Sequence, residues 1–375
     1  MPALLALAFV AFVSLGLPDG VLGVAWPAVR GSFDVRMGAL GALSIGLGAG
    51  YVLSSFFAGR LVSRFGVGTV LWASAGCAAA GLALHAGAPV WWLFAAGAPV
   101  IGLGSGAVDA ALNVYVARTF SARQVNWLHA CYSIGATLGP ILMAASIQRA
   151  GSWRTGYAAL GGLLLVLALL FGITRGRWGG ASTSPAVEGA GAAFRHPMVR
   201  LQMAAFFVYT GLEATLGQWA FTILTELHQV PAPRAAGEVA AYFGAIAIGR
   251  ILLGFVVEKA GVDRLVRWSS WGAAAGAALF AFGPGEAARA AGLVLAGLAL
   301  APIFPCLMSR TPVRLGEERA VHAIGFQVSA ATVGAALLPA LGGLLGEAWG
   351  LRAVALEAAA LAALFALLHE RLLRA

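Results

Sequence analysis

Charged residues are scarce in this chain. Asp, Glu, Lys and Arg together make up 10% of its 375 residues, and the single lysine is Lys259. A soluble protein of this length would carry about 25% charged residues. Because the chain is also 60% hydrophobic, with a mean hydropathy of +0.87, we conclude that it is an integral membrane protein.

Cysteines are few, and nucleotide-binding motifs are lacking. Cys77, Cys131 and Cys306 lie far apart within apolar segments, so the sequence predicts neither a disulfide framework nor a metal site. The segment GLGSGA has no strand before it and no Walker lysine after it, which excludes a phosphate-binding loop. The sequence therefore predicts no enzyme, no cofactor and no self-contained ATP-driven pump. Energy for transport would come from a gradient.

Long apolar runs take the place of charge. A helix needs about 20 apolar residues to cross a bilayer, and twelve such stretches occur. Runs such as LGGLLLVLALLFGI do not alternate with period two, as the strands of a membrane β-barrel would. The sequence predicts spanning helices over residues 3–28, 37–60, 68–88, 91–117, 125–148, 154–174, 200–225, 236–257, 265–283, 287–309, 320–346 and 350–369.

An internal repeat with an offset of 195 residues organises these runs. Residues 59–84 read GRLVSRFGVGTVLWASAGCAAAGLAL, and residues 254–279 read GFVVEKAGVDRLVRWSSWGAAAGAAL. Two parallel repeats of several spans each are a common construction of secondary transporters. We therefore predict an all-α membrane protein with twelve transmembrane helices in two six-helix bundles related by pseudo-two-fold symmetry.

The predicted domains follow from the repeat. Residues 1–174 form the first bundle and residues 200–375 the second, joined by a cytoplasmic linker over 175–199 that is rich in Gly, Ala, Ser and Pro. Most basic residues fall in loops on the side that holds both termini, and positively charged loops stay cytoplasmic. We predict a multi-pass protein of the plasma membrane (bacterial inner membrane) with both termini cytoplasmic. The net charge of +9 then reflects topology, and no nucleic-acid partner is expected.

Acidic residues inside the first-half spans are candidate functional groups. An Asp at the centre of a spanning helix costs roughly +2.5 to +3.5 kcal/mol to insert into the membrane, so a functional role is its default interpretation. Asp19 lies between Pro18 and Gly20, which should loosen the helix; it is a candidate for proton coupling and substrate binding, or else a buried cap for the broken helix. Asp109 and Asn113 lie four apart on one helix face. They are either a proton carrier and a substrate ligand or a pair that bonds only to itself.

The second half contains a different set of polar groups. Glu213 falls one residue from the repeat position of Asp19, and Gln218 and Trp219 follow it. A carboxylate, an amide and an indole suit a sugar, whose hydroxyls take hydrogen bonds and whose ring stacks on the indole. Alternatively, Trp219 is an interface anchor. Gln327, in the eleventh span, is either a further hydroxyl ligand or a structural residue.

Two segments resemble a cytoplasmic motif of the major facilitator superfamily. GRLVSRFG and GFVVEKAG are similar to its Gly-x-x-x-Asp-Arg-x-Gly pattern, although Ser63 replaces the acid in the first copy and Glu258 keeps it in the second. This resemblance covers essentially the whole chain. Arg250 pairs with a carboxylate as a structural or gating ion pair, or else reaches the interface. The residues assigned to an inner gate are Arg60, Arg64, Arg118, Arg250 and Glu258.

Other segments resemble the fucose permease-like branch of sugar transporters. They are PDGVLGVAWP, GSGAVDAALNVYV, LHACYSIGATLGP, GLEATLGQW and LAPIFP. The resemblance implies one acid in the first span and another in the fourth that take part in proton coupling and sugar binding. These positions match Asp19 and Asp109, with Asn113 one turn further along as a ligand. Some relatives couple to sodium instead.

The leading hypothesis is a proton-coupled symporter of a monosaccharide or related polyol. It would work by alternating access, as a monomer in the lipid bilayer. A proton-antiport exporter of drugs or metabolites is the alternative, because the same acids would serve it equally well. A membrane sensor or scaffold without transport activity would need a sizeable soluble domain, for which the predicted spans leave little chain.

Overall fold

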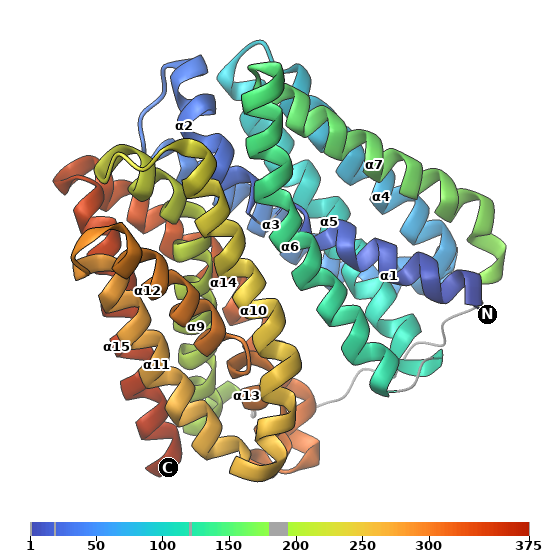
Figure 1. The fold of residues 1–375 in the computed structure, drawn as a ribbon. Coiled ribbons are helices and arrows are strands. Elements are labelled where there is room, and N and C mark those ends of the chain that lie inside the picture. The colour runs from blue at the N-terminus through green and yellow to red at the C-terminus, as the bar shows by residue number, and fades with distance from the viewer. Residues whose placement is uncertain (1, 19, 120–121, 180–193, 375) are drawn as a thin grey trace. The chain divides into compact units, whose positions relative to one another are not determined.

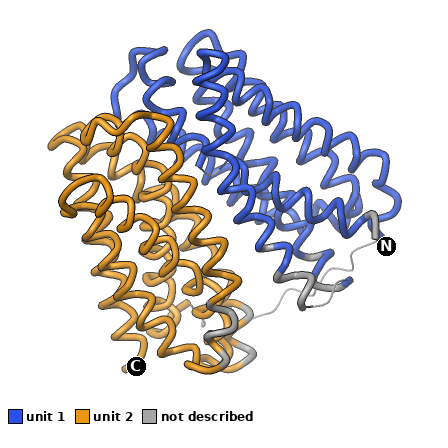
Figure 2. Tube along the Cα trace, viewed as in Figure 1, with its two compact units in different colours: residues 1–185 blue, residues 186–375 orange. Residues whose placement is uncertain are grey.

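The computed structural model describes residues 2–18, 20–119, 122–179 and 194–374 (Figure 1). Every regular element in these ranges is helical. The chain divides into two compact units, unit 1 over Met1–Pro185 and unit 2 over Ala186–Ala375 (Figure 2). The all-α class predicted from the sequence is therefore confirmed.

Each unit is a bundle of long helices. Unit 1 contains α1 (Pro2–Gly16), α2 (Val21–Phe33), α3 (Ala39–Phe65), α4 (Val67–Gly87), α5 (Trp91–Thr119), α6 (Ala122–Ala150), α7 (Trp153–Thr174) and the short 3-10 helix η1 (Arg175–Arg177). Unit 2 contains α9 (Pro197–Thr222), the π-helical turn η2 (Ile223–Leu227), α10 (Ala232–Ala260), α11 (Val262–Phe282), α12 (Gly285–Leu300), α13 (Ile303–Leu315), α14 (Glu317–Trp349) and α15 (Leu351–Arg374).

The helix boundaries confirm the repeat. Shifting the bounds of α4 by 195 residues gives those of α11, and both helices follow a glycine of the same backbone conformation. Gly66 and Gly261 each have φ of +79°. Each also closes the preceding helix, because its N–H donates to the carbonyl of Val62 or Val257. A residue with a side chain is strained at this φ, so the glycine of the repeated motif sets the turn in both units.

The helices break at different places in the two units. In unit 1, α1 ends at Gly16 and α2 begins at Val21, and the pair is bent by 41°. This is the break expected from Pro18 and Gly20. In unit 2 the corresponding helix α9 is continuous, and the break falls instead between α12 and α13, at Ala301 and Pro302. Proline has no N–H to donate and its ring clashes with the preceding turn, which accounts for this break.

Ten of the twelve predicted spans meet a test of length and apolar composition. Within the described residues, nine helical segments are long and apolar enough to cross a membrane, and the bent pair α1–α2 is a tenth. The two helices that do not qualify are α9 and α11. Glu213 and Gln218 lower the mean hydropathy of α9, and Arg267 that of α11. Both pack within unit 2, α9 against α14 and α15, and α11 against α12 and α15.

The first residues of the predicted linker belong to unit 1. Trp178 is 1% exposed and packs its ring 4.9 Å from that of Tyr115 and 5.5 Å from that of Phe171. Its indole N–H donates to Oγ1 of Thr174 at 3.1 Å. Residues 175–178, which the sequence assigned to the linker, thus continue the packing of unit 1. Residues 180–193 lie outside the described part of the chain, and α9 begins at Pro197.

Glycines bring α3 and α5 into direct backbone contact. A Cβ atom on Gly102 would lie 2.0 Å from the carbonyl oxygen of Leu47, and one on Gly106 would lie 2.3 Å from that of Tyr51. Both distances are far shorter than any real contact, so only glycine fits. Small residues of this kind are how membrane helices approach closely.

We predict that Gly106→Ala destabilises the protein. The added methyl group must push α3 away from α5, and overpacking of this kind lowers the free energy of unfolding by about 1–3 kcal/mol. Thermal unfolding of the purified protein in detergent measures the change. Gly162→Ala on α7 is the matched control, because a Cβ there meets nothing within 4 Å. Equal melting temperatures for the two variants would contradict the close contact.

Candidate functional site

Asp109 is at the centre of a hydrogen-bonded group in unit 1. The hydroxyl of Tyr51 on α3 donates to Oδ2 of Asp109 on α5 at 2.6 Å. Nδ2 of Asn113, one turn further along α5, donates to Oδ1 at 2.9 Å and to the backbone oxygen of Asp109 at 3.0 Å. All three side chains are half-buried. The four-residue spacing thus predicted one bonded partner correctly, and the sequence interpretation missed the other, Tyr51.

Tyr51 reaches Asp109 because α3 and α5 touch. The backbone of Tyr51 lies against Gly106, and the hydroxyl of Ser55 donates to the carbonyl of Gly106 at 3.1 Å. The small residues in GLGAGY and GLGSGA indicate close packing for each helix separately. They do not indicate that these two helices pack against each other, and so the sequence could not identify Tyr51.

A second carboxylate, Glu213, lies in unit 2 among two tyrosines and an arginine. The hydroxyl of Tyr209, one turn earlier on α9, donates to Oε2 of Glu213 at 2.5 Å. The hydroxyl of Tyr242 on α10 donates to the backbone oxygen of Glu213 at 3.0 Å. Nη2 of Arg250, also on α10, lies 4.0 Å from Oε1.

Burial divides this group into a fixed part and an accessible part. Tyr209 and Tyr242 are at most 1% exposed, whereas the side chains of Glu213 and Arg250 keep 22% and 24% exposure. Tyr209 therefore holds the carboxylate of Glu213 from the buried side, Tyr242 holds the backbone of the same residue, and the ion pair occupies the side that remains open. Pairing with a carboxylate is one of the two interpretations of Arg250 that the sequence allowed.

Two predicted substrate ligands lie in the packed interior of unit 2. Gln327 is 0% exposed: its Nε2 donates to Oε1 of Gln202 at 2.7 Å, and its Oε1 accepts from Thr311 at 3.1 Å. Trp219 is also 0% exposed, and its indole N–H donates to the carbonyl of Pro339 at 2.9 Å. In this conformation neither residue faces open space, so both positions favour a structural role. A fully buried Trp219 is also not an interface anchor.

The remaining site predictions are only partly covered by the structure. Asp19 lies outside the described residues, as do the side chains of Arg118 and Glu258. Gln218 is half-buried on α9, five residues after Glu213. Their roles stay predictions.

Arg60 and Arg64 of the first motif copy are exposed at the end of α3. Their guanidinium carbons lie 5.7 Å and 5.3 Å from the ring centres of Phe57 and Phe65, respectively. Within the described part of the chain neither arginine forms an ion pair. Their assignment to a gate also stays a prediction.

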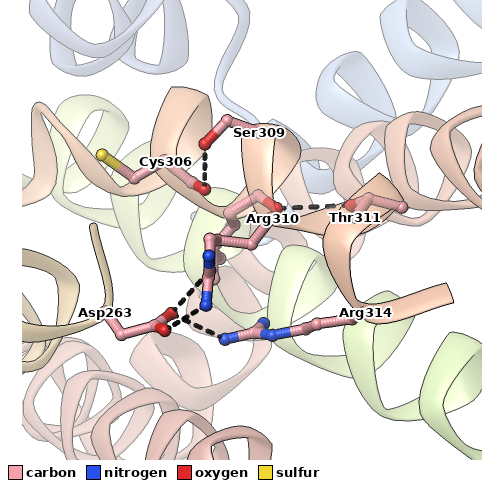
Figure 3. A network of polar contacts seen from close by, with 7 residues as sticks. Asp263, Cys306, Ser309, Arg310, Thr311 and Arg314 are labelled. Atoms are coloured by element: carbon pink, nitrogen blue, oxygen red, sulfur yellow. Dashed lines mark hydrogen bonds and ion pairs between the residues drawn. The ribbon is translucent and has the colours of Figure 1, made fainter. Parts of the chain in front are cut away.

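The second motif copy is followed by a charged network that the sequence interpretation missed. Asp263, the second residue of α11, accepts from Nε of Arg310 at 3.0 Å and from its Nη2 at 2.5 Å (Figure 3). Nη2 of Arg314, one turn further along α13, donates to the same carboxylate at 3.1 Å. Two-point contact of this kind is the strong geometry of an arginine–carboxylate pair. The network joins α11 to α13, and the sequence signals it by an Asp two residues after GFVVEKAG and by two arginines spaced by four residues.

Two helical units with the same helix order, each holding a bonded carboxylate within its bundle, have the construction of a secondary transporter. The family model described as Major Facilitator Superfamily matches residues 7–319 and 222–375. The chain belongs to this superfamily and is a multi-pass membrane protein. The curated relative "Bypass of stop codon protein 6" from Saccharomyces cerevisiae is 23% identical over an alignment of 278 residues that covers 66% of this chain. The chain spans 56% of that relative's length.

Solved structures share the fold over nearly the whole chain. A point mutant of the nucleoside transporter NupG matches with a TM-score of 0.82 at 14% identity, over 98% of both chains. A bacterial homologue of the human lysosomal transporter Spinster, inward-facing and occupied, matches with a TM-score of 0.83 at 13% identity, over 100% of this chain and 97% of its own. A point mutant of the Escherichia coli fucose:proton symporter FucP has a TM-score of 0.65 at 17% identity, over 98% of both chains. These similarities establish the major facilitator fold.

We predict that Asp263→Ala destabilises unit 2. The substitution removes the acceptor of three hydrogen bonds and leaves Arg310 and Arg314 without their carboxylate. Hydrogen bonds to charged groups contribute about 1.5–3 kcal/mol each when well buried, and Asp263 is 36% exposed. We therefore expect the free energy of unfolding to fall by about 1–3 kcal/mol in total.

The measurement is the thermal midpoint of the purified protein in detergent. Arg264→Gln is the control, because Arg264 is the next residue, is exposed and takes no part in the network. If Asp263→Ala unfolds at the same temperature as Arg264→Gln, the network does not stabilise the fold.

Proposed function

We propose that the chain is a secondary active transporter that couples the uptake of a monosaccharide or related polyol to the entry of protons by alternating access. The observation that carries the proposal is the carboxylate of Asp109, which lies within a spanning helix. One of its oxygens accepts a hydrogen bond from Tyr51 and the other accepts one from Asn113. Ionisable groups in this position usually mark proton or substrate pathways. We propose Asp109 as the proton carrier.

The two partners of Asp109 respond differently to a proton. A protonated carboxyl oxygen becomes a donor, whereas an amide N–H₂ can only donate. A proton on Oδ1 would therefore weaken the bond from Asn113 to that oxygen and leave the side chain of Asn113 held by the backbone oxygen of Asp109 alone. A proton on Oδ2 would only reverse the bond to Tyr51, because a phenol both donates and accepts. Protonation at Oδ1 is thus the event that changes the arrangement of this group, and it is the coupling step that we propose.

On the side of unit 2, we propose Glu213 and Gln218 as ligands of the substrate hydroxyls. The side chain of Glu213 is 22% exposed, while Tyr209 donates to its carboxylate and Tyr242 to its backbone oxygen. Arg250, 4.0 Å from Glu213, is close enough to compete with a substrate hydroxyl for the carboxylate. Release of this long ion pair on binding would link substrate occupancy to a conformational change. The charge distribution of the loops supports cytoplasmic termini.

The names of the structural neighbours suggest which substrates to test. Two of them are a fucose:proton symporter and a nucleoside transporter. Both fucose and the ribose of a nucleoside offer several hydroxyls to a carboxylate and an amide. A panel of monosaccharides, polyols and nucleosides is therefore the first choice.

We predict that Asp109→Asn abolishes proton-driven accumulation. Asparagine cannot carry the proton, so uptake into proteoliposomes under an imposed pH gradient should fall about tenfold or more. Exchange of labelled for unlabelled substrate without a gradient should continue. An Asp109→Asn protein that still accumulates substrate against its gradient would remove Asp109 from this role.

Tyr51→Phe tests the hydrogen bond that orients the carboxylate of Asp109, because the variant keeps the carboxylate itself and removes only the hydroxyl that bonds to it. Removal of the hydroxyl leaves Oδ2 without its 2.6 Å donor, so we expect the pH dependence of uptake to shift while exchange continues. Tyr157→Phe is the matched control, because Tyr157 is buried and its hydroxyl has no hydrogen-bond partner in the described part of the chain. Identical pH profiles for the two variants would exclude Tyr51 from coupling.

We predict that a sugar or nucleoside of the panel raises the thermal midpoint of the purified protein. A ligand present at 100 times its dissociation constant adds about 2.7 kcal/mol to the stability of the folded state. The panel is measured at two pH values, with and without sodium, beside a set of lipophilic cations. Stabilisation by the cations alone would contradict the sugar proposal and favour a proton-antiport exporter. Stabilisation that needs sodium would contradict proton coupling.

A further inference from the structure

An open pocket lies between α11 and α15 at the end of unit 2 where α15 terminates. These two helices pack side by side (Figure 1). The pocket has a volume of about 460 Å³. It is lined by Arg267, Trp271, Leu367, Glu370, Arg371 and Arg374. Three guanidinium groups face one carboxylate, so the lining has an excess of positive charge.

The carboxylate is already engaged with α11. Nε of Arg267 donates to Oε1 of Glu370 at 2.6 Å, and the indole N–H of Trp271 donates to the same oxygen at 3.2 Å. Glu370 therefore balances the charge of Arg267. Arg371 and Arg374 are exposed, and neither forms an ion pair with another residue of the described chain. Two guanidinium groups are available for an anion.

The surface beside these arginines is apolar. Trp268 is 58% exposed, Trp271 47%, Leu367 55% and Leu364 44%. In a bundle that crosses a membrane, exposed leucines and tryptophans of this kind face the lipid, and tryptophan is typical of the level of the headgroups. The pocket thus combines cationic groups at the end of the helices with acyl-chain contacts further along them.

We propose that this pocket binds the headgroup of an anionic phospholipid. The phosphate would lie between Arg371 and Arg374, and the acyl chains would lie along Trp268 and Leu367. Basic pockets between spanning helices on the cytoplasmic side bind anionic headgroups in other membrane proteins. The choice of the cytoplasmic leaflet depends on the proposed orientation of the termini. The site itself is independent of the transported substrate.

The sequence of unit 1 does not repeat the arginines that line this pocket. At the offset of 195 residues, Arg267 corresponds to Trp72, Leu367 to Gly172, Arg371 to Gly176 and Arg374 to Gly179. The helices are repeated but the arginines that would hold the phosphate are not. Unit 1 still has two exposed arginines at the corresponding end, Arg175 and Arg177. They supply a control of equal charge.

The test measures the dissociation constant of phosphatidylglycerol for the intact protein in a neutral detergent, by native mass spectrometry or by the rise in thermal midpoint. Phosphatidylcholine is the neutral comparison. We expect phosphatidylglycerol to bind more tightly than phosphatidylcholine. The double variant R371Q/R374Q should weaken phosphatidylglycerol binding about tenfold or more, while R175Q/R177Q should stay within about twofold of the original protein.

A third variant is expected to raise the affinity for phosphatidylglycerol instead of lowering it. Glu370→Gln removes the carboxylate that repels phosphate and frees Arg267, so phosphatidylglycerol should bind more tightly.

Equal losses of phosphatidylglycerol affinity in the two double variants would overturn the proposal, because the attraction would then come from surface charge in general. Equal binding of phosphatidylcholine would also overturn it. Competition by water-soluble glycerol phosphate at the same concentration as the lipid would show a soluble phosphate ligand instead. None of these readouts requires transport activity.

Discussion

The core of a bilayer offers no water to complete a hydrogen bond, so a polar group in a spanning helix costs free energy unless it finds a partner within the protein. Much of the detail of both units follows from this constraint. Tyr51 and Asp109 bond across α3 and α5, and Gln327 bonds to Gln202 across α14 and α9. The indole of Trp219 reaches a backbone carbonyl on α14. Apolar packing alone would let such helices slide or rotate, whereas these bonds specify which faces meet.

The same constraint explains why the two units share helix boundaries such as those of α4 and α11 but have different polar side chains at corresponding positions. A helix boundary depends on local features such as the turn glycines Gly66 and Gly261, and both copies keep them. A side chain inside the bundle depends on the neighbouring helix, which has diverged. The repeat position of Asp109 is Phe304, whose ring packs 6.3 Å from that of Tyr209. That of Asp263 is Gly68, where a Cβ would lie 2.1 Å from the carbonyl oxygen of Arg175.

The fold was largely predictable, and the site only in part. Apolar length and the repeat placed α4 and α11 within three residues of their actual bounds. The bond between Asp109 and Asn113 follows from a spacing of four within one helix. Tyr51 was missed because its bond to Asp109 joins two helices, and no spacing within one helix encodes which other helix it meets. The bond from Trp219 to the carbonyl of Pro339 was missed for the same reason, since it joins α9 to α14.

The positions of the helix breaks affect the contacts of the candidate site residue Glu213. Pro18, at the break in unit 1, corresponds at the offset of 195 to Glu213 in the unbroken helix α9. The bond from Tyr209 to Glu213 needs that continuity, because the two residues face each other only across one complete turn. The break in unit 2 contributes differently. Leu300 ends α12, so its carbonyl has no partner in that helix, and the hydroxyl of Tyr209 lies 3.4 Å from it. The unbroken helix α9 thus brings Tyr209 to Glu213, and the break after α12 places an alternative acceptor beside the same hydroxyl.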